Sequence, residues 1–162
     1  MEVQTPGPPD LSNSWKIFFD GSKRQQGAGA GVILISPKGD KFKYVLQINF
    51  EKASNNEAEY EALLHCMRMA KACGASRLII YGNSNLVVQQ TMRDCEAVAN
   101  NMSVYQKLYN ILEGDFDGCE LNYVSRANNT EVDELANIGS TRGPVSPGVF
   151  LESINHWSIK PA

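Results

Sequence analysis

The spacing of hydrophobic residues changes along the chain, and each change marks a different kind of predicted element. Residues 15–20 alternate between an apolar and a more polar face, which is typical of a β-strand. Two further strands are predicted over residues 28–35 and 41–49, on either side of a turn signal at residues 37–40. Three strands joined by short turns predict an antiparallel meander.

The next segment, residues 56–73, has the spacing of an amphipathic helix. Its apolar stripe contains Ala62, Leu63, Cys66, Ala70 and Cys73, and its polar face contains Glu57, Glu61, His65, Arg68 and Lys71. Glu59 falls in the middle of the apolar stripe, where a charge is costly unless it is paired or bound to a metal. Two interpretations stay open for Glu59: a site residue, or a solvated carboxylate at a frayed helix start.

A continuous apolar run at residues 78–81 ends at Gly82, Asn83 and Ser84. Such runs are typical of a central parallel strand that is covered on both faces. In open α/β sheets, sites form just beyond the carboxyl end of a strand. Asn83 is therefore expected to face the active-site crevice.

Further helices are predicted over residues 85–93, 100–112 and 129–141, and a further strand over residues 119–124. The order β-β-β-α-β-α-α-β-α predicts an α/β fold with a five-stranded mixed sheet and helices on both faces. The predicted divisions are a flexible linker (1–13), one domain (14–142) and a C-terminal tail (143–162). The tail is expected to dock through Val149, Phe150 and Leu151.

Composition narrows the possible partners and compartment. The net charge of −3 argues against strong nonspecific binding of nucleic acid, although divalent ions can bridge acidic groups to phosphates. The four cysteines (Cys66, Cys73, Cys95 and Cys119) form no C-x-x-C pair, which favours buried thiols in a reducing, intracellular compartment. Whether that compartment is cytoplasm or nucleus stays open. No apolar run approaches the ~20 residues of a membrane span, so no membrane partner is expected.

Two common site types are not supported by the sequence. The glycine run at residues 27–31 precedes a strand and lacks the G-x-G-x-x-G spacing, so it indicates close packing rather than a nucleotide loop. His65 and His156 are the only histidines, and neither accompanies a nucleophile motif.

Three acids remain at the ends or starts of predicted elements: Asp20, Glu59 and Asp133. In the predicted sheet they can converge beside Asn83. Clustered carboxylates repel one another unless divalent cations lie among them, and oxygen-only ligands favour Mg²⁺ or Mn²⁺. Two such ions can support phosphodiester hydrolysis. The alternative is a plain α/β domain whose acids are only solvated.

Four stretches carry a resemblance to a known family. They read FDGS (19–22), SNNEAE (54–59), YGNS (81–84) and NTEVDELA (129–136). In this order they resemble the ribonuclease H family, specifically the domain carried in LTR retrotransposon polyproteins of plants. The resemblance covers residues 15–141. It implies a ribonuclease H-like fold and cleavage of the RNA strand of an RNA–DNA hybrid. It also implies an origin in a polyprotein with reverse transcriptase or integrase portions as partners.

The resemblance also implies residue roles. Asp20, Glu59 and Asp133 match three of the family's four metal-binding carboxylates, with two Mg²⁺ or Mn²⁺ ions in the active form. Asn83 occupies the fourth catalytic position. The implied substrate-binding residues are Gly21, Ser22, Ser54, Asn55, Asn56, Asn85, Arg126 and Asn129. Contacts with 2′-hydroxyls would distinguish RNA from DNA. Arg126 lies in a segment that resembles the archaeal-like branch, and it is either a phosphate-handling residue or a plain surface arginine.

Two departures from the family pattern motivate a second hypothesis for the function. Asn83 replaces an Asp, which removes a charge that holds the metals; a cost of ~3–4 kcal/mol would slow the reaction roughly a hundred- to a thousandfold. The region after Asn85 lacks a basic protrusion, so unaided hybrid binding is expected to be weak. The alternative function is a catalytically inactive module, derived from a retroelement, that binds nucleic acid or a protein.

Overall fold

The structure is a computed structural model that describes residues 14–50, 53–84 and 100–158. The strands are β1 (Ser14–Arg24), β2 (Gly27–Ile35), β3 (Lys41–Ile48), β4 (Arg77–Gly82), β5 (Gly118–Tyr123) and β6 (Val149–Ile154). The helices are α1 (Asn55–Ala72), α3 (Asn100–Glu113) and α4 (Thr130–Thr141), with a short 3₁₀ turn η2 (Arg126–Asn128). The strands form one sheet in the order β5-β4-β1-β2-β3-β6.

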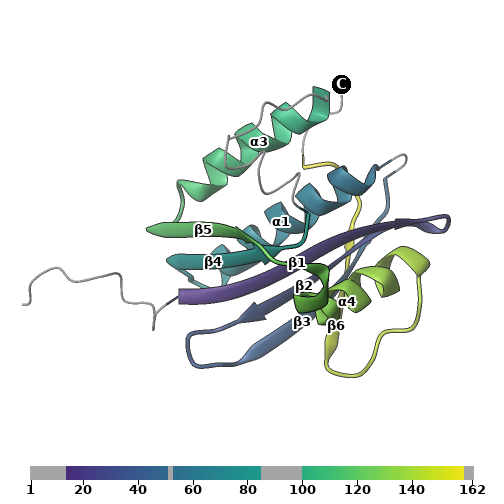
Figure 1. Cartoon of the computed structure of the whole chain (residues 1–162), viewed down its shortest axis with the longest axis horizontal. Helices are drawn as coiled ribbons and strands as arrows, with labels where there is room; N and C mark the ends of the chain where they lie inside the picture. The colour runs from purple at the N-terminus through teal and green to yellow at the C-terminus, as the bar shows by residue number, and fades with distance from the viewer. Residues whose placement is uncertain (1–13, 51–52, 85–99, 159–162) are drawn as a thin grey trace, which may run out of the picture.

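The sheet is mixed, and helices cover both of its faces. β1, β2 and β3 pair antiparallel, whereas β4 pairs parallel to β1 and β5 parallel to β4. Figure 1 shows α1 and α3 on one side of the sheet and α4 on the other. The predicted α/β class and the antiparallel meander are therefore confirmed. The short helix predicted over residues 85–93, together with Asn85 and Cys95, lies outside the described residues.

The predicted count of five strands is wrong, because the sheet has a sixth strand. β6 comes from the segment that the sequence assigned to a tail, and it pairs parallel to β3. Phe150 stacks on Tyr44 with ring centroids 5.1 Å apart, while Leu151 stays 51% exposed. An edge strand that is half exposed on both faces lacks the alternation that identifies a strand in sequence. The proposed division into linker, domain and tail stays a prediction.

Glycines bring α4 directly onto the backbone of β2. A Cβ on Gly29 would lie 2.2 Å from the Ser140 backbone N, and a Cβ on Gly31 would lie 2.4 Å from the Val132 backbone O. No larger residue fits at either position without moving the helix. The prediction that the glycine run serves close packing in a strand is confirmed.

The polar face predicted for α1 is partly wrong. Glu61 is only 1% exposed, because α3 and the C-terminal segment cover that side of the helix. The Tyr105 hydroxyl donates to Glu61 Oε2 at 2.6 Å, and the Ser158 backbone N–H donates to the same oxygen at 2.9 Å. A buried carboxylate with this many donors is satisfied. Helical periodicity could not reveal it, since its partners come from distant parts of the chain.

The predictions about cysteines and membranes can be compared with the described residues. Cys66 is buried as expected, Cys119 is half-buried, and Cys73 is exposed, which corrects the expectation that it lies on the buried stripe. All three are free thiols. In the described ranges, no helix combines the length and the apolar character required to cross a membrane.

Candidate active site

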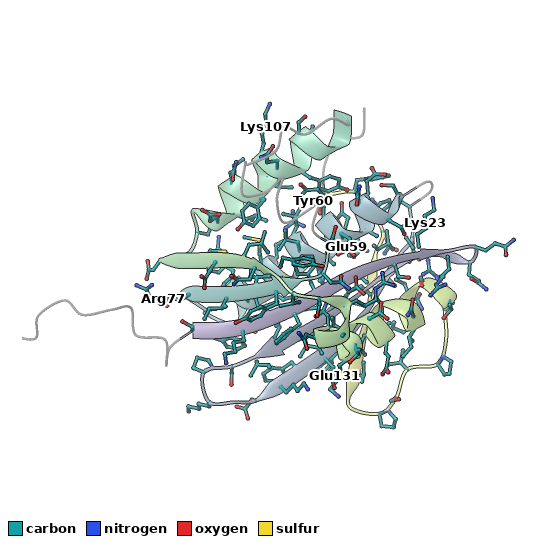
Figure 2. All side chains as sticks on the ribbon, viewed as in Figure 1. Lys23, Glu59, Tyr60, Arg77, Lys107 and Glu131 are labelled. Carbon is teal, nitrogen blue, oxygen red and sulfur yellow. The ribbon has the colours of Figure 1, made fainter. Side chains whose placement is uncertain are left out.

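A cavity of about 400 Å³ opens where β1, α1, β4 and α4 meet. Its lining residues are Gly21, Ser22, Lys23, Arg24, Asn55, Asn56, Glu59, Asn83, Ser84, Arg126, Asp133 and Asn137. Figure 2 shows Glu59 near the centre of the molecule and Lys23 toward the end of β1 that turns into β2. The cavity lies beyond the carboxyl end of β4, which is the place the sequence predicted.

Asp20 and Glu59 form the buried part of the site. Their exposed fractions are 3% and 7%, and the two side chains interact directly, because each affects the pKa of the other. Asp20 also interacts with Asp133. Burial is the main reason that the pKa of Asp20 rises to about 6, with Asp133 raising it further and Glu59 and Arg126 opposing the rise. Burial and Asp20 also raise the pKa of Glu59 well above its usual value.

Local sequence explains why Glu59 faces Asp20. Ser54 begins α1 as its N-cap: its Oγ accepts a hydrogen bond from the Glu57 backbone N–H at 3.1 Å, and Glu57 accepts one from the Ser54 backbone N–H in return. A Cβ on Gly21 would lie 2.5 Å from the Glu59 backbone N. Glycine at position 21 therefore lets β1 pass directly against the first turns of α1, which brings Asp20 and Glu59 together.

Asn83 lies immediately after the last residue of β4. In the parallel register of β1 and β4, Gly82 is paired with Phe19, so Asn83 and Asp20 each follow that pair by one residue. A Cβ on Gly82 would lie 2.5 Å from the Phe19 ring, so the close approach of the strands requires glycine there. The structure thus brings Asn83 to the cavity that Glu59 and Asp133 also line.

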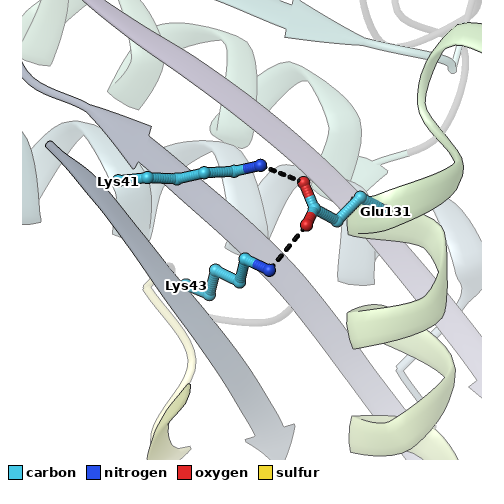
Figure 3. Close-up of polar contacts among 3 residues, drawn as sticks. All are labelled: Lys41, Lys43 and Glu131. Carbon is cyan, nitrogen blue, oxygen red and sulfur yellow. Dashed lines mark hydrogen bonds and ion pairs between the residues drawn. The ribbon is translucent and has the colours of Figure 1, made fainter. Parts of the chain in front are cut away.

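The NTEVDELA stretch contains three acids, and only one of them faces the cavity. Glu131 receives ion pairs from Lys41 and Lys43 on β3 (Figure 3). These lysines hold the pKa of the Glu131 carboxyl below its usual value. Glu134 is exposed, while Asp133 lines the cavity. The structure thus brings Asp133 to the cavity, while its role as a metal ligand stays a prediction.

Other predicted substrate-binding residues divide into three groups. Gly21, Ser22, Asn55, Asn56 and Arg126 line the cavity. Ser54 caps α1, and Asn129 is buried, donating from Nδ2 to the Phe19 backbone O at 3.2 Å; neither is among the lining residues of this cavity. Asn85 lies outside the described residues. The binding roles of all of them stay predictions.

Sequence reasoning missed Asn137, Lys23 and Arg24. Asn137 lies one helical turn after Asp133 and donates from Nδ2 to Asp133 Oδ2 at 3.4 Å. The spacing of four residues was a usable signal, because such residues lie on the same side of a helix. Lys23 and Arg24 could not be assigned to the site from sequence, since β1 was expected to end at Asp20.

The chemistry of the site fits divalent metal ions. Its donors are carboxylate and amide oxygens, which suit Mg²⁺ or Mn²⁺. The buried Glu59 Oε2 has no hydrogen-bond partner, so it is an acceptor available to a ligand. Within the described residues, no set of three or more His, Cys, Asp and Glu side chains has the geometry of a metal-ligand group. Asp20 nevertheless interacts with both Glu59 and Asp133.

Comparisons with known proteins agree with this arrangement. The sequence model of the family described as "Reverse transcriptase-like" matches residues 18–139. Ribonuclease HI of Halobacterium salinarum is 29% identical over 133 residues, which are 80% of this chain and 65% of that protein. The Bacillus subtilis protein YpeP is 37% identical over 88 residues, which are 51% of this chain and 37% of that protein. The matches thus span less than two thirds of either relative.

A solved structure extends the likeness to the fold. RNase H1 from Halobacterium salinarum NRC-1 superposes with a TM-score of 0.70 at 27% identity, covering 80% of this chain and 99% of that one. The family match covers more than half of the chain and contains Asp20, Glu59, Asn83 and Asp133. The chain therefore belongs to the reverse transcriptase-like family, which is of the ribonuclease H type.

Proposed function

We propose that the chain is a ribonuclease H-type endonuclease that hydrolyses the RNA strand of an RNA–DNA hybrid, with its activity lowered by Asn83. The observation that carries this proposal is that Glu59, Asp133 and Asn83 line one polar cavity, while the buried Asp20 interacts with both Glu59 and Asp133. The resemblance to ribonuclease HI of Halobacterium salinarum supports the reaction class.

Asp20, Glu59 and Asp133 would hold two Mg²⁺ or Mn²⁺ ions, which when bound would activate water and stabilise the leaving oxygen. Asn83 offers an acceptor oxygen in the fourth position but no negative charge. Loss of that charge weakens the binding of cations, and a cost of ~3–4 kcal/mol corresponds to a rate roughly a hundred- to a thousandfold lower. Asn83 therefore lowers the rate without preventing the fold.

The residues around the acids suit a phosphate backbone. Lys23, Arg24 and Arg126 line the same cavity as the acids, and they can neutralise phosphates on either side of the cleaved bond. Asn55 and Asn56, at the start of α1, can hydrogen-bond to 2′-hydroxyls. Because the whole chain carries a net charge of −3, hybrid binding should depend strongly on divalent ions.

The cellular setting that we propose follows from the resemblance in the sequence. The domain would come from a retroelement polyprotein of plant type, with reverse transcriptase or integrase portions as its covalent or physical partners. It would work inside the cell, where the three described free thiols stay reduced.

Cleavage of a labelled RNA–DNA hybrid tests the proposal. This chain and its Asn83→Asp variant would be compared in Mg²⁺ and in Mn²⁺, with the double variant Asp20→Asn, Asn83→Asp as the control that removes a second acid. We expect slow cleavage by the chain and cleavage about a hundred- to a thousandfold faster by the Asn83→Asp variant. If the Asn83→Asp protein binds the hybrid but does not cut it in either metal, the chain is a binding module instead.

A further inference from the structure

Asn137 of α4 lies between the acid Asp133 and two donors from the far end of β1. Its Oδ1 accepts hydrogen bonds from Ser22 Oγ and from Arg24 Nη2, each at 3.0 Å. Its Nδ2 donates to Asp133 Oδ2 at 3.4 Å. Ser22 in turn accepts a hydrogen bond from Ser140 Oγ at 3.0 Å. The amide thus joins two strand residues to one acid of the cavity.

The identity of these partners fixes the orientation of the amide. An arginine guanidinium can only donate hydrogen bonds, so Arg24 must face the carbonyl oxygen of Asn137. With the oxygen held in that direction, the NH₂ group is turned toward Asp133. The distance of 3.4 Å is at the long end of the hydrogen-bond range, which suits a contact that orients a carboxylate more than one that binds it tightly.

We propose that Asn137 is a positioning residue for Asp133: its amide, set by Ser22 and Arg24, fixes how the Asp133 carboxylate faces the cavity. The inference rests on the proposed function, because it assigns Asp133 to metal binding. Groups that orient a metal-binding carboxylate typically change metal affinity by roughly 10- to 100-fold when they are removed. The competing interpretation is that Asn137 only ties α4 to β1.

Calorimetry with Mn²⁺ separates these two interpretations. The Asn83→Asp protein would serve as the parent, since all four acid positions are then filled. We expect Asn137→Leu, which has a similar size but no amide, to weaken Mn²⁺ binding about tenfold while the far-ultraviolet circular dichroism is unchanged. The matched control is Asn155→Leu, because Asn155 is exposed, does not line the cavity and accepts a hydrogen bond from Asn49, which follows β3. Equal Mn²⁺ affinity of the Asn137→Leu and Asn155→Leu proteins overturns the inference.

A double-mutant cycle tests whether Ser22 acts through Asn137. In the parent, Ser22→Ala removes one donor to Asn137 Oδ1 and should weaken Mn²⁺ binding severalfold. In the Asn137→Leu background the same change should have almost no further effect, since residues that act through one contact are not additive. Full additivity of the two changes means that Ser22 acts elsewhere, which contradicts the proposed arrangement.

Nuclear magnetic resonance supplies a readout that needs neither metal nor activity. The side-chain amide protons of Asn137 should exchange with solvent faster in a Ser22→Ala protein, whereas those of Asn155 should be unaffected. Unchanged exchange at Asn137 overturns the inference even if the Asn83→Asp protein binds no Mn²⁺. If the parent binds Mn²⁺ and cuts the hybrid, and its Asn137→Leu variant cuts at the same rate, the positioning role alone is refuted. The proposed function then remains intact.

Discussion

Asp20 of β1 interacts directly with Glu59 of α1, and both side chains are almost fully shielded from solvent. Burial and mutual repulsion both disfavour the charged forms of two neighbouring carboxyl groups, which raises their pKa values. Gly21 permits this contact, because any side chain there would collide with the backbone of α1. Without a cation, protonation of this pair therefore persists to a higher pH than protonation of exposed carboxyl groups, whose pKa is about 4.

This contact predicts that the metal-free protein loses stability as the pH rises. The pKa of Asp20 is raised from 3.8 to about 6, and that of Glu59 is also raised, so the folded chain binds more protons than the unfolded chain between these values. The contribution of these two groups to the unfolding free energy is fully present below pH ~4 and is lost as the pH rises through about 6. Chemical unfolding in EDTA from about pH 4.5 to about pH 8 measures it. Over that range the unfolding free energy of the Asp20→Asn protein should fall less than that of the unchanged chain, by a difference of at most about 3 kcal/mol.

Salts of Mn²⁺ supply the complementary measurement. A cation that binds only the folded chain should raise the unfolding temperature at about pH 8, where the acids are ionised, and raise it much less at about pH 5. An equal rise in unfolding temperature at both pH values would contradict the assignment of these acids as ligands.

Arg126 should influence the acids through its charge. Its positive charge opposes the rise in the pKa of both Asp20 and Glu59. We therefore expect Arg126→Gln to raise both pKa values further, measured from the carboxyl carbon shifts of metal-free protein. Arg68→Gln is the control, because Arg68 is exposed and donates to Ser158 on another part of the surface. If Arg126→Gln and Arg68→Gln have the same small effect, Arg126 is a plain surface arginine.

The buried contact between Tyr105 and Glu61 should contribute to folding rather than to the site. Tyr105→Phe removes a donor 2.6 Å from a carboxylate that is 1% exposed, which should cost about 1.5–3 kcal/mol. Urea unfolding measures this cost. Tyr123→Phe is the matched control, since Tyr123 is 52% exposed, and its effect should stay within about 0.5 kcal/mol.

The glycines of β2 should tolerate no side chain. In Gly31→Ala the added Cβ would meet the Val132 backbone O at 2.4 Å, and such overpacking costs typically about 1–3 kcal/mol. In Gly143→Ala the nearest atom is 3.5 Å from the added Cβ, which is an ordinary contact, so the change should be small. Thermal unfolding of the two proteins side by side gives the comparison, and equal unfolding temperatures would disprove the packing argument.

The sequence predicted the parts of the structure that depend on local pattern. The meander, α1 and the convergence of Asp20, Glu59 and Asp133 all follow from element ends that can be read in order. It did not predict contacts that join distant segments. Asn137 and Ser22 are 115 residues apart, and Glu61 and Ser158 are 97 apart, so neither pair leaves a periodic signal. β6 was missed for a different reason: its burial does not alternate along the strand, since only Ile154 is buried, and it pairs through its backbone with β3.

The backbone contact between α4 and the sheet has a consequence for how this domain can change over time. Gly29 and Gly31 on β2, with Gly139 on α4, set the height of the helix by the thickness of two polypeptide backbones. In most helix–sheet interfaces that height depends on the volumes of the side chains between the layers. Here the backbone contact itself sets the height of α4, and with it how closely Asp133 approaches Asp20. Substitutions of core residues elsewhere can therefore accumulate and change the stability of the domain, while the spacing of these two acids is preserved.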